Sequence, residues 1–195
     1  MAKKEVRKMQ LLTIALDEFI TKGFYGTSTR EIANKAQISS GLLFHYFDSK
    51  ESLYKELVET GLSKMHLDVP LAEQNPEMYL ENMVQSILGQ LASNRFFAKM
   101  FVLIDAAQHT IGIPEEIKEL LQHQDMFLQC RQIIEYGQQK GQFKSGNSQA
   151  LCVAFLGAIQ GIAQEKVRVE ETPLPEKEWI MDILLKSDRG RKNDK

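Results

Sequence analysis

The stretch from residue 27 to residue 50 constrains the fold most, because it has the punctuation of two short helices joined by a tight turn. Ser28 and Glu31 have the spacing of a capping box, which marks a helix start. Residues 37–39 are too few for anything but a turn, and Ser39 or the serine after it can cap a second helix. This pattern predicts a helix-turn-helix that leads into a third helix.

The second short helix would carry polar and aromatic side chains on its outer side. Leu43 and Phe47 are four residues apart, so they share the buried face. The outer side then holds Ser39, Ser40, Gly41, Leu42, His45 and Tyr46, with Phe44 at its edge. A helix of this kind resembles the recognition helix of a helix-turn-helix, which enters the major groove of DNA.

One run, TSTREIANKAQISSGLLFHYFDSKESLY, resembles the DNA-binding signature of the TetR/AcrR family of bacterial transcriptional repressors. The matching features are the Thr before the first short helix, Ile32-Ala33, Ala36, Ile38-Ser39, Gly41, the aromatic at 44, Phe47, Lys50-Glu51 and Leu53. The chain departs from the family pattern at Phe44, where tyrosine is usual, and at His45-Tyr46, where the order is often reversed. Phe44 cannot give a phenolic hydrogen bond to phosphate.

The resemblance implies roles for nine residues of this stretch. Phosphate contacts are expected from Thr29, Ser39, Ser40, Tyr46 and Lys50, and base-edge contacts from Ser40, Gly41, Leu42 and His45, with Phe44 in the wider DNA-binding set. Leu42 is suited to a thymine methyl group. Lys50 falls in the first turn of the next helix, where the helix dipole disfavours a cation, and a nearby phosphate would offset that cost.

The distribution of charge agrees with one DNA-contacting end. Residues 1–50 carry eight basic and five acidic residues, while the remainder carries sixteen basic and twenty-one acidic residues. A basic end on an acidic body suits a protein that touches phosphate with one domain only. The basic residues Lys3, Lys4, Arg7 and Lys8 could contact phosphate or form a solvated chain end.

Helical periodicity continues along the chain without sustained period-two alternation, which predicts an all-α protein of about nine helices. The helices after residue 50 are expected near 50–67, 75–91, 94–110, 114–140, 148–169 and 176–186. We therefore expect a helix-turn-helix DNA-binding domain over 1–50, a ligand-binding and dimerisation domain over 51–187, and a disordered tail over 188–195.

The last two predicted helices are too apolar to be half exposed on a monomer. Interior glycines cost about 1 kcal/mol each relative to alanine, and small residues four apart let another helix come close. The expected dimer interface comprises Phe155, Gly157, Ala158, Gly161, Ile162, Trp179, Ile183 and Leu184. The alternative is that these helices pack only within the subunit.

The body is rich in large flexible and aromatic side chains, which are either plain core or the lining of an apolar cavity. Together with polar groups that could orient a ligand, the candidate set is Met65, His66, Met83, Phe97, Met100, Phe101, His109, Met126, Phe127 and Arg131. The family resemblance implies an effector pocket in this body without indicating its ligand.

Signatures of catalysis are missing from the sequence. We find no glycine-rich phosphate loop, no Cys/His spacing for zinc and no nucleophile elbow, so no catalytic residue, metal or cofactor is expected. Cys130 and Cys152 fit buried, reduced thiols better than a disulfide. No hydrophobic signal region begins the chain and no apolar run approaches a membrane span of about 18 residues, so a cytoplasmic protein without a membrane partner is expected.

Together these patterns predict a homodimeric DNA-binding regulator, a repressor that a small and largely apolar ligand releases from an inverted-repeat operator. Two alternatives remain open at the level of sequence. One is an enzyme that uses the body cavity as its active site. The other is an architectural protein that binds DNA without sequence preference.

Overall fold

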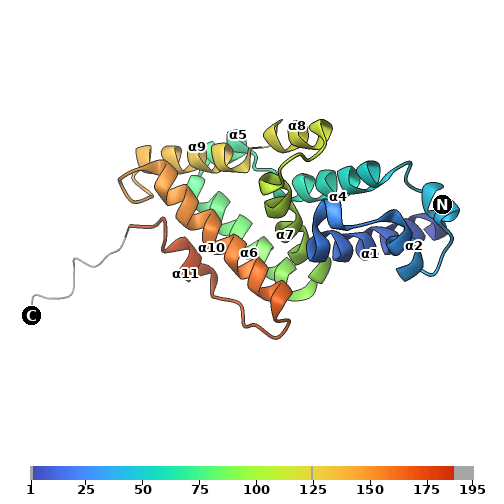
Figure 1. Ribbon diagram of the computed structural model, residues 1–195. Coiled ribbons are helices and arrows are strands. Elements are labelled where there is room, and N and C mark those ends of the chain that lie inside the picture. Colours follow the sequence, from blue (N-terminus) through green and yellow to red (C-terminus); the bar gives the residue numbers. More distant parts are fainter. Residues whose placement is uncertain (1, 124, 187–195) are drawn as a thin grey trace, which may run out of the picture. The chain divides into compact units, whose positions relative to one another are not determined.

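The computed structural model describes residues 2–123 and 125–186, and over these ranges the chain is helical and contains no strand (Figure 1). The predicted all-α fold is confirmed. The described residues form two compact units, one of residues 2–65 and 95–123 and the other of 66–94 and 125–186. The predicted functional boundary at residue 50 stays a prediction, and the predicted disordered tail, 188–195, lies outside the described residues.

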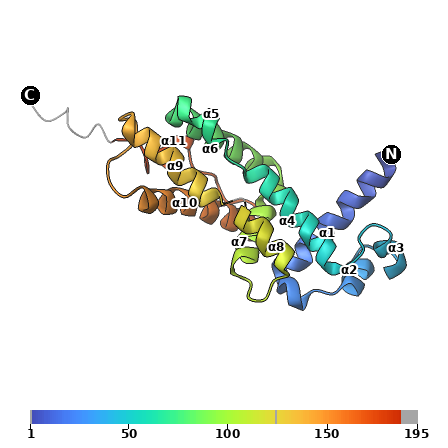
Figure 2. The same cartoon turned by 90° about the horizontal axis from the view of Figure 1, so that it is seen from above.

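The first unit joins the helix-turn-helix to two helices from later in the chain. Its helices are α1 (Ala2–Gly26), α2 (Thr29–Lys35), α3 (Ser40–Phe44), α4 (Lys50–Met65), α7 (Arg95–His109) and α8 (Glu115–His123). Helix α1 packs against α2, α4 and α7, and α4 packs against α7 and α8 (Figure 2). Gly23 has a positive φ of 73°, which interrupts the helical backbone of α1.

An aromatic cluster holds the centre of the first unit. The ring of Tyr54 meets the rings of Phe19 and Phe24 edge-on, at centroid distances of 4.7 and 5.0 Å. All three side chains are buried, and burial raises the pKa of Tyr54 to about 12. Edge-to-face contacts of this kind add to the free energy gained by burying the rings. The cluster therefore fixes α4 against α1.

Charged side chains add links between the same helices. Glu18 of α1 is almost fully buried, and the hydrogen bond from Lys35, with a further contribution from Lys22, lowers the pKa of its carboxyl group. Lys8 pairs with Glu56 across α1 and α4 at 2.7 Å. Glu18 must stay ionised to keep its partner, so the contribution of this pair to stability is lost as the pH falls through the lowered pKa.

The second unit is built around α9 and α10. Its helices are α5 (Val69–Gln74), α6 (Pro76–Ser93), α9 (Met126–Gln139), α10 (Ser148–Arg168) and α11 (Lys177–Met181). Helix α9 packs against α5, α6 and α10, and α11 packs against α6 and α10. Cys130 and Cys152 are buried in this unit as free thiols, as predicted.

The predicted helix over 114–140 is two helices, α8 and α9. The side chain of Asp125 accepts a hydrogen bond from the backbone N–H of Leu128 at 3.0 Å, so it starts α9 as an N-cap. The structure also adds α5, which lies in the gap that the predicted helices over 50–67 and 75–91 left between them. Pro70 lies in the first turn of α5, where its missing N–H leaves no bond unmade.

The last predicted helix, over 176–186, is shorter in the structure. Helix α11 ends at Met181, and the chain then runs beside residues 143–144. The backbone N–H of Lys144 donates to the carbonyl of Leu184 at 2.7 Å, and Phe143 forms an isolated antiparallel bridge with Leu185. The N–H groups of residues 182–185 still donate to carbonyls three or four residues back, so the helix ends in turns just before the chain pairs with residues 143–144.

Helix α10 corrects one expectation about the membrane. By length and composition alone it matches a membrane span, and only 28% of its most apolar window is buried inside the subunit. The sequence analysis expected no such segment. A helix of a water-soluble protein whose apolar side is covered by other protein surface meets the same test. The exposed apolar side of α10 therefore needs a covering surface.

Candidate nucleic-acid interface

The first short helix begins with the capping box that the sequence predicted. The Ser28 hydroxyl accepts the backbone N–H of Glu31 at 3.3 Å, and the Glu31 carboxylate accepts the N–H of Ser28 at 3.3 Å. The buried hydroxyl of Thr27 donates to the carbonyls of Glu18 and Gly23 at 3.1 and 2.8 Å. Thr29 follows as the first residue of α2 and is half-buried.

The turn between α2 and α3 is tight and closed by backbone bonds. Gln37 adopts a positive φ of 55°, in the left-handed region that residues other than glycine rarely adopt. The N–H of Ile38 donates to the carbonyl of Ala33 at 3.0 Å. The Ser39 hydroxyl then caps α3 by accepting the N–H of Leu42 at 3.2 Å. These bonds fix where α3 starts and which side it turns outward.

Helix α3 buries one side and leaves the other in solvent. Leu43 and Phe47 are buried, as their spacing predicted. The exposed side carries Gly41, Leu42, Phe44 and His45, while Ser40 and Tyr46 are half-buried and Ser39 is exposed. We call the surface of residues 39–46 the α3 ridge. Gly41 and His45 are four apart along its middle, and Leu42 and Phe44 flank them with 42% and 45% of their surface exposed.

The ring of His45 lies edge-on to the ring of Tyr46, with centroids 5.7 Å apart. The contact holds two candidate donors side by side at the end of the α3 ridge. Their own role in binding stays a prediction.

Gly41 has no reason inside the subunit to be glycine. Its φ is not positive, and a Cβ added to it would meet only the Ser39 hydroxyl, at 4.0 Å. Glycine in a helix is less favourable than alanine by roughly 0.5–1 kcal/mol. A surface outside the chain that comes close to the α3 backbone would account for the residue.

Gly41→Ala is expected to raise the free energy of unfolding by roughly 0.5–1 kcal/mol and to weaken DNA binding. Overpacking of a close contact costs about 1–3 kcal/mol, which corresponds to a roughly 5- to 150-fold loss of affinity. Urea denaturation and gel-shift titration measure the two effects. Gly89→Ala is the matched control, since a Cβ there also meets nothing within 4 Å. Unchanged DNA affinity of Gly41→Ala would contradict the close approach.

Lys50 makes a contact that the sequence did not predict. Its ammonium group donates to the carbonyl of Phe24 at 2.9 Å and lies over the Phe24 ring, 4.3 Å from the centroid. The cation thus ties the start of α4 to the end of α1, in the first turn where the helix dipole disfavours it. An ammonium group has three donors, so further donors remain for an anion.

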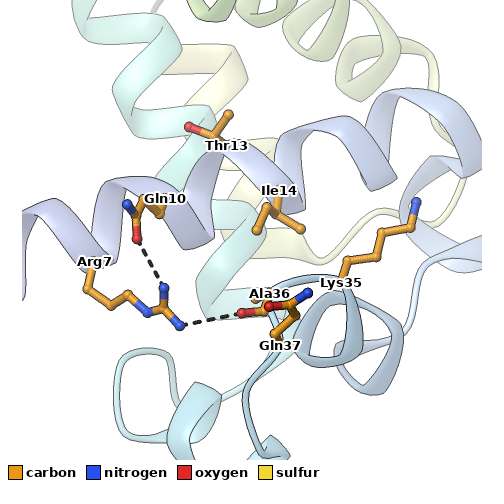
Figure 3. Close-up of a pocket in the computed structure, with 7 residues that line it drawn as sticks. All are labelled: Arg7, Gln10, Thr13, Ile14, Lys35, Ala36 and Gln37. Atoms are coloured by element: carbon orange, nitrogen blue, oxygen red, sulfur yellow. Dashed lines mark hydrogen bonds between the residues drawn. The ribbon is translucent and has the colours of Figure 1, made fainter.

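The basic start of α1 divides into two kinds of side chain. Lys3 and Lys4 are exposed. Arg7 donates to Gln10 at 3.1 Å and to the carbonyl of Ala36 at 3.4 Å, so it links α1 to the turn (Figure 3). Lys8 pairs with Glu56 and lies 5.6 Å from the centroid of the Phe47 ring. Lys3 and Lys4 therefore remain candidates for phosphate.

A depression of about 420 Å³ lies beside this link, on the first unit (Figure 3). Its lining residues are Arg7, Gln10, Thr13, Ile14, Lys35, Ala36 and Gln37. None of them belongs to the predicted ligand set. At its edge, Arg7 bridges α1 and the turn through its bonds to Gln10 and to the carbonyl of Ala36.

The residues predicted to hold a ligand are divided between the two units. Met65, Phe97, Met100, Phe101 and His109 belong to the first unit, and His66, Met83, Met126, Phe127 and Arg131 to the second. Met65, Phe97, Met100 and Phe101 are buried. His66, His109 and Phe127 are exposed, and Met83, Met126 and Arg131 are half-buried. Gly61 lets Met100 and Ile104 approach within 3.0 Å of where a Cβ would stand, so part of this set is close-packed core. The ligand pocket stays a prediction.

The residues predicted for the dimer interface are also divided. Phe155 and Leu184 are fully buried within the second unit, so they belong to its core rather than to an outer surface. Gly157, Gly161 and Trp179 are exposed, and Ala158, Ile162 and Ile183 are half-buried. The side of the helix that faces inward depends on tertiary packing, which the apolar pattern alone did not show.

Among residues 2–123 and 125–186, no group of three His, Cys, Asp or Glu side chains is placed to hold a metal ion. The first unit presents the α3 ridge, the capped helix starts and the basic side chains near them. Such groups bind phosphate and base edges.

Comparison with known proteins identifies this arrangement. Residues 11–57 match the family model described as bacterial regulatory proteins, tetR family. The HTH-type transcriptional repressor KstR2 of Rhodococcus jostii is 27% identical over 164 residues, which cover 78% of this chain and 76% of that protein.

Solved structures share the fold over most of the chain. The MbdR regulator from Azoarcus sp. CIB aligns with a TM-score of 0.72 at 21% identity, covering 92% of this chain and 97% of that one. The ketosteroid transcriptional regulator KstR2 of Mycobacterium tuberculosis aligns with a TM-score of 0.67 at 20% identity, covering 93% and 96%. The comparisons thus support a TetR-family DNA-binding transcriptional regulator, with a tetR-type helix-turn-helix over residues 11–57 and an all-helical body.

Proposed function

We propose that the protein is a dimeric repressor that places the α3 ridge of each subunit in a major groove of an inverted-repeat operator. The outward side of α3 is the observation that carries this proposal, since its exposed residues have no role in the core. A single short recognition helix buries too little surface for useful affinity, so two are needed. Twofold symmetry then places the half-sites about 34–36 Å apart, or a multiple of that distance.

The outer side of α10 supports the dimer. Ala150, Val153, Ala154, Gly157 and Gly161 recur at helical spacing, and all five are exposed. A Cβ added to either glycine meets nothing within 4 Å. Val153 exposes 54% of its surface, and Trp179 of α11 exposes 65%. An apolar face lined with small residues suits close packing against the same face of a second subunit.

We call this side of α10, together with Trp179, the α10 face. Burial of the face in a dimer would also cover an apolar helix that the subunit itself buries only in part. The helix would then need no membrane. Phe155 and Leu184, which the sequence had placed in the interface, support the face from inside.

A ligand that binds the body would release the operator by favouring a conformation with a different separation of the two α3 ridges. By linkage, DNA must weaken binding of that ligand by the same factor. The relatives' names include repressors, and the KstR2 of M. tuberculosis is described as a ketosteroid regulator. For this chain we propose a small, largely apolar effector and no cofactor.

Selection of bound duplexes from a random library tests the proposal. The enriched sequences are expected to contain an inverted repeat, and a random duplex should bind far more weakly than the selected one. An architectural protein would bind both with equal affinity. An enzyme would be indicated by turnover in a substrate screen, which the proposal does not expect.

Lys50→Ala is expected to weaken binding to operator and random DNA by a similar factor and to lower the salt slope of log K by roughly one unit. The reason is the loss of one proposed phosphate contact at the start of α4. Lys64→Ala, which removes an exposed cation from the last turn of the same helix, is the control. A weaker affinity with an unchanged slope would mean that Lys50 acts only through its bond to Phe24.

A further inference from the structure

The middle of the α3 ridge offers few hydrogen-bonding groups to base edges. Of the five exposed residues of the ridge, Gly41, Leu42 and Phe44 have no such group in their side chains, whereas Ser39 and His45 at its two ends do. Base edges are read either by hydrogen bonds or by apolar contact with the thymine 5-methyl group. An outer surface of this composition favours the second kind of reading.

Leu42 is the side chain best placed for such a contact. Its backbone N–H is used by the Ser39 cap at 3.2 Å, which fixes the residue in the first turn of α3. Its side chain keeps 42% of its surface exposed, although leucine gains free energy when it leaves water. A Cβ at the neighbouring Gly41 would have only an ordinary contact with the Ser39 hydroxyl, at 4.0 Å, so no crowding explains the glycine and the backbone at this point can approach the groove closely.

We infer that Leu42 reads the 5-methyl group of a thymine at one position in each operator half-site. This inference rests on the proposed DNA-binding function and adds the chemical group that is recognised. Phe44 flanks the other side of the Gly41–His45 line, so it meets a different part of the groove and serves as the control.

Replacement of thymine by uracil in the selected operator removes the methyl group and nothing else. Burial of one methyl group corresponds to a roughly fourfold change in affinity, or about 15-fold when both half-sites are changed. Each thymine pair of the operator is replaced in turn, and binding is measured by fluorescence anisotropy. We expect one symmetry-related pair of positions to show this loss with the wild-type protein.

The same substitutions are then measured with Leu42→Ala, Leu42→Met and Phe44→Ala. Leu42→Ala should bind the thymine and uracil operators equally at the sensitive position, while Leu42→Met and Phe44→Ala should keep the discrimination. Circular dichroism shows whether each variant retains its helices.

Three results would overturn the inference. One is specific operator binding that is insensitive to uracil at every position. Another is a sensitivity that Leu42→Ala retains in full, which would assign the methyl contact to another residue. A protein with no sequence preference at all would instead refute the proposed function, and the reading by Leu42 with it.

Discussion

Gly157→Glu is expected to convert the protein into a monomer and to lower operator affinity at least about 100-fold. Gly157 lies near the middle of α10, in the exposed α10 face, and a Cβ added there would meet nothing within 4 Å. In the proposed dimer the face is buried against its own copy. A carboxylate there would be desolvated and would face a second carboxylate across the twofold axis.

Sedimentation velocity and operator titration measure the two effects. Gly89→Glu is the matched control, because Gly89 is also an exposed helical glycine with open space around it and lies on α6. The control should remain dimeric and bind the operator normally. A dimeric Gly157→Glu protein with normal DNA affinity would remove the α10 face from the interface.

Gly137→Ala is expected to lower the free energy of unfolding by about 3–5 kcal/mol. The added Cβ would lie 2.0 Å from Cδ2 and 2.3 Å from Cε2 of Phe143. The Phe143 ring is buried in the second unit, next to the backbone bridge between Phe143 and Leu185. The ring therefore cannot make room for the added Cβ without leaving the core. The expected loss is that of a buried phenylalanine side chain.

Urea denaturation of the single and double variants tests this account. Phe143→Ala should be destabilised by a similar amount, and Gly137→Ala combined with Phe143→Ala should be no less stable than Phe143→Ala alone. Gly89→Ala, with its open surroundings, should instead gain stability. A Gly137→Ala protein within about 1 kcal/mol of the wild type would show that the ring can move aside.

The local features of the helix-turn-helix could be predicted from sequence because each depends on residues a few positions apart. The Ser28 capping box, the Ser39 cap and the inward pair Leu43 and Phe47 all span three or four residues. Their geometry is set by the helix itself. These features also decide which side of α3 faces outward, so the α3 ridge followed from the sequence.

Contacts between distant residues could not be predicted in the same way. The bond from Lys50 to Phe24 spans 26 residues, and the bond from Arg7 to Ala36 spans 29. A lysine at a helix start was read as a phosphate ligand, since nothing in its neighbours pointed to an internal carbonyl. The unfavourable position of Lys50 in the helix dipole was the one available signal of an added partner.

The body was harder for a related reason. Apolar periodicity shows that a helix has a buried side but not which neighbours cover it, so Phe155 and Leu184 were placed in the interface although they are core. The same periodicity continued through Asp125, whose side chain caps the start of α9 by accepting the N–H of Leu128. The structure adds most through the surroundings of the glycines. An added Cβ would clash at Gly137, so the fold requires that glycine, whereas the fold does not require Gly157 and Gly161.

Sedimentation equilibrium of the protein on its selected operator tests the central claim most directly. The account predicts a complex with two subunits of 22.3 kDa, or a multiple of two, on each inverted repeat, and much weaker binding to a single half-site. One subunit bound with full affinity to a half-site would contradict the presentation of two α3 ridges by a symmetric dimer.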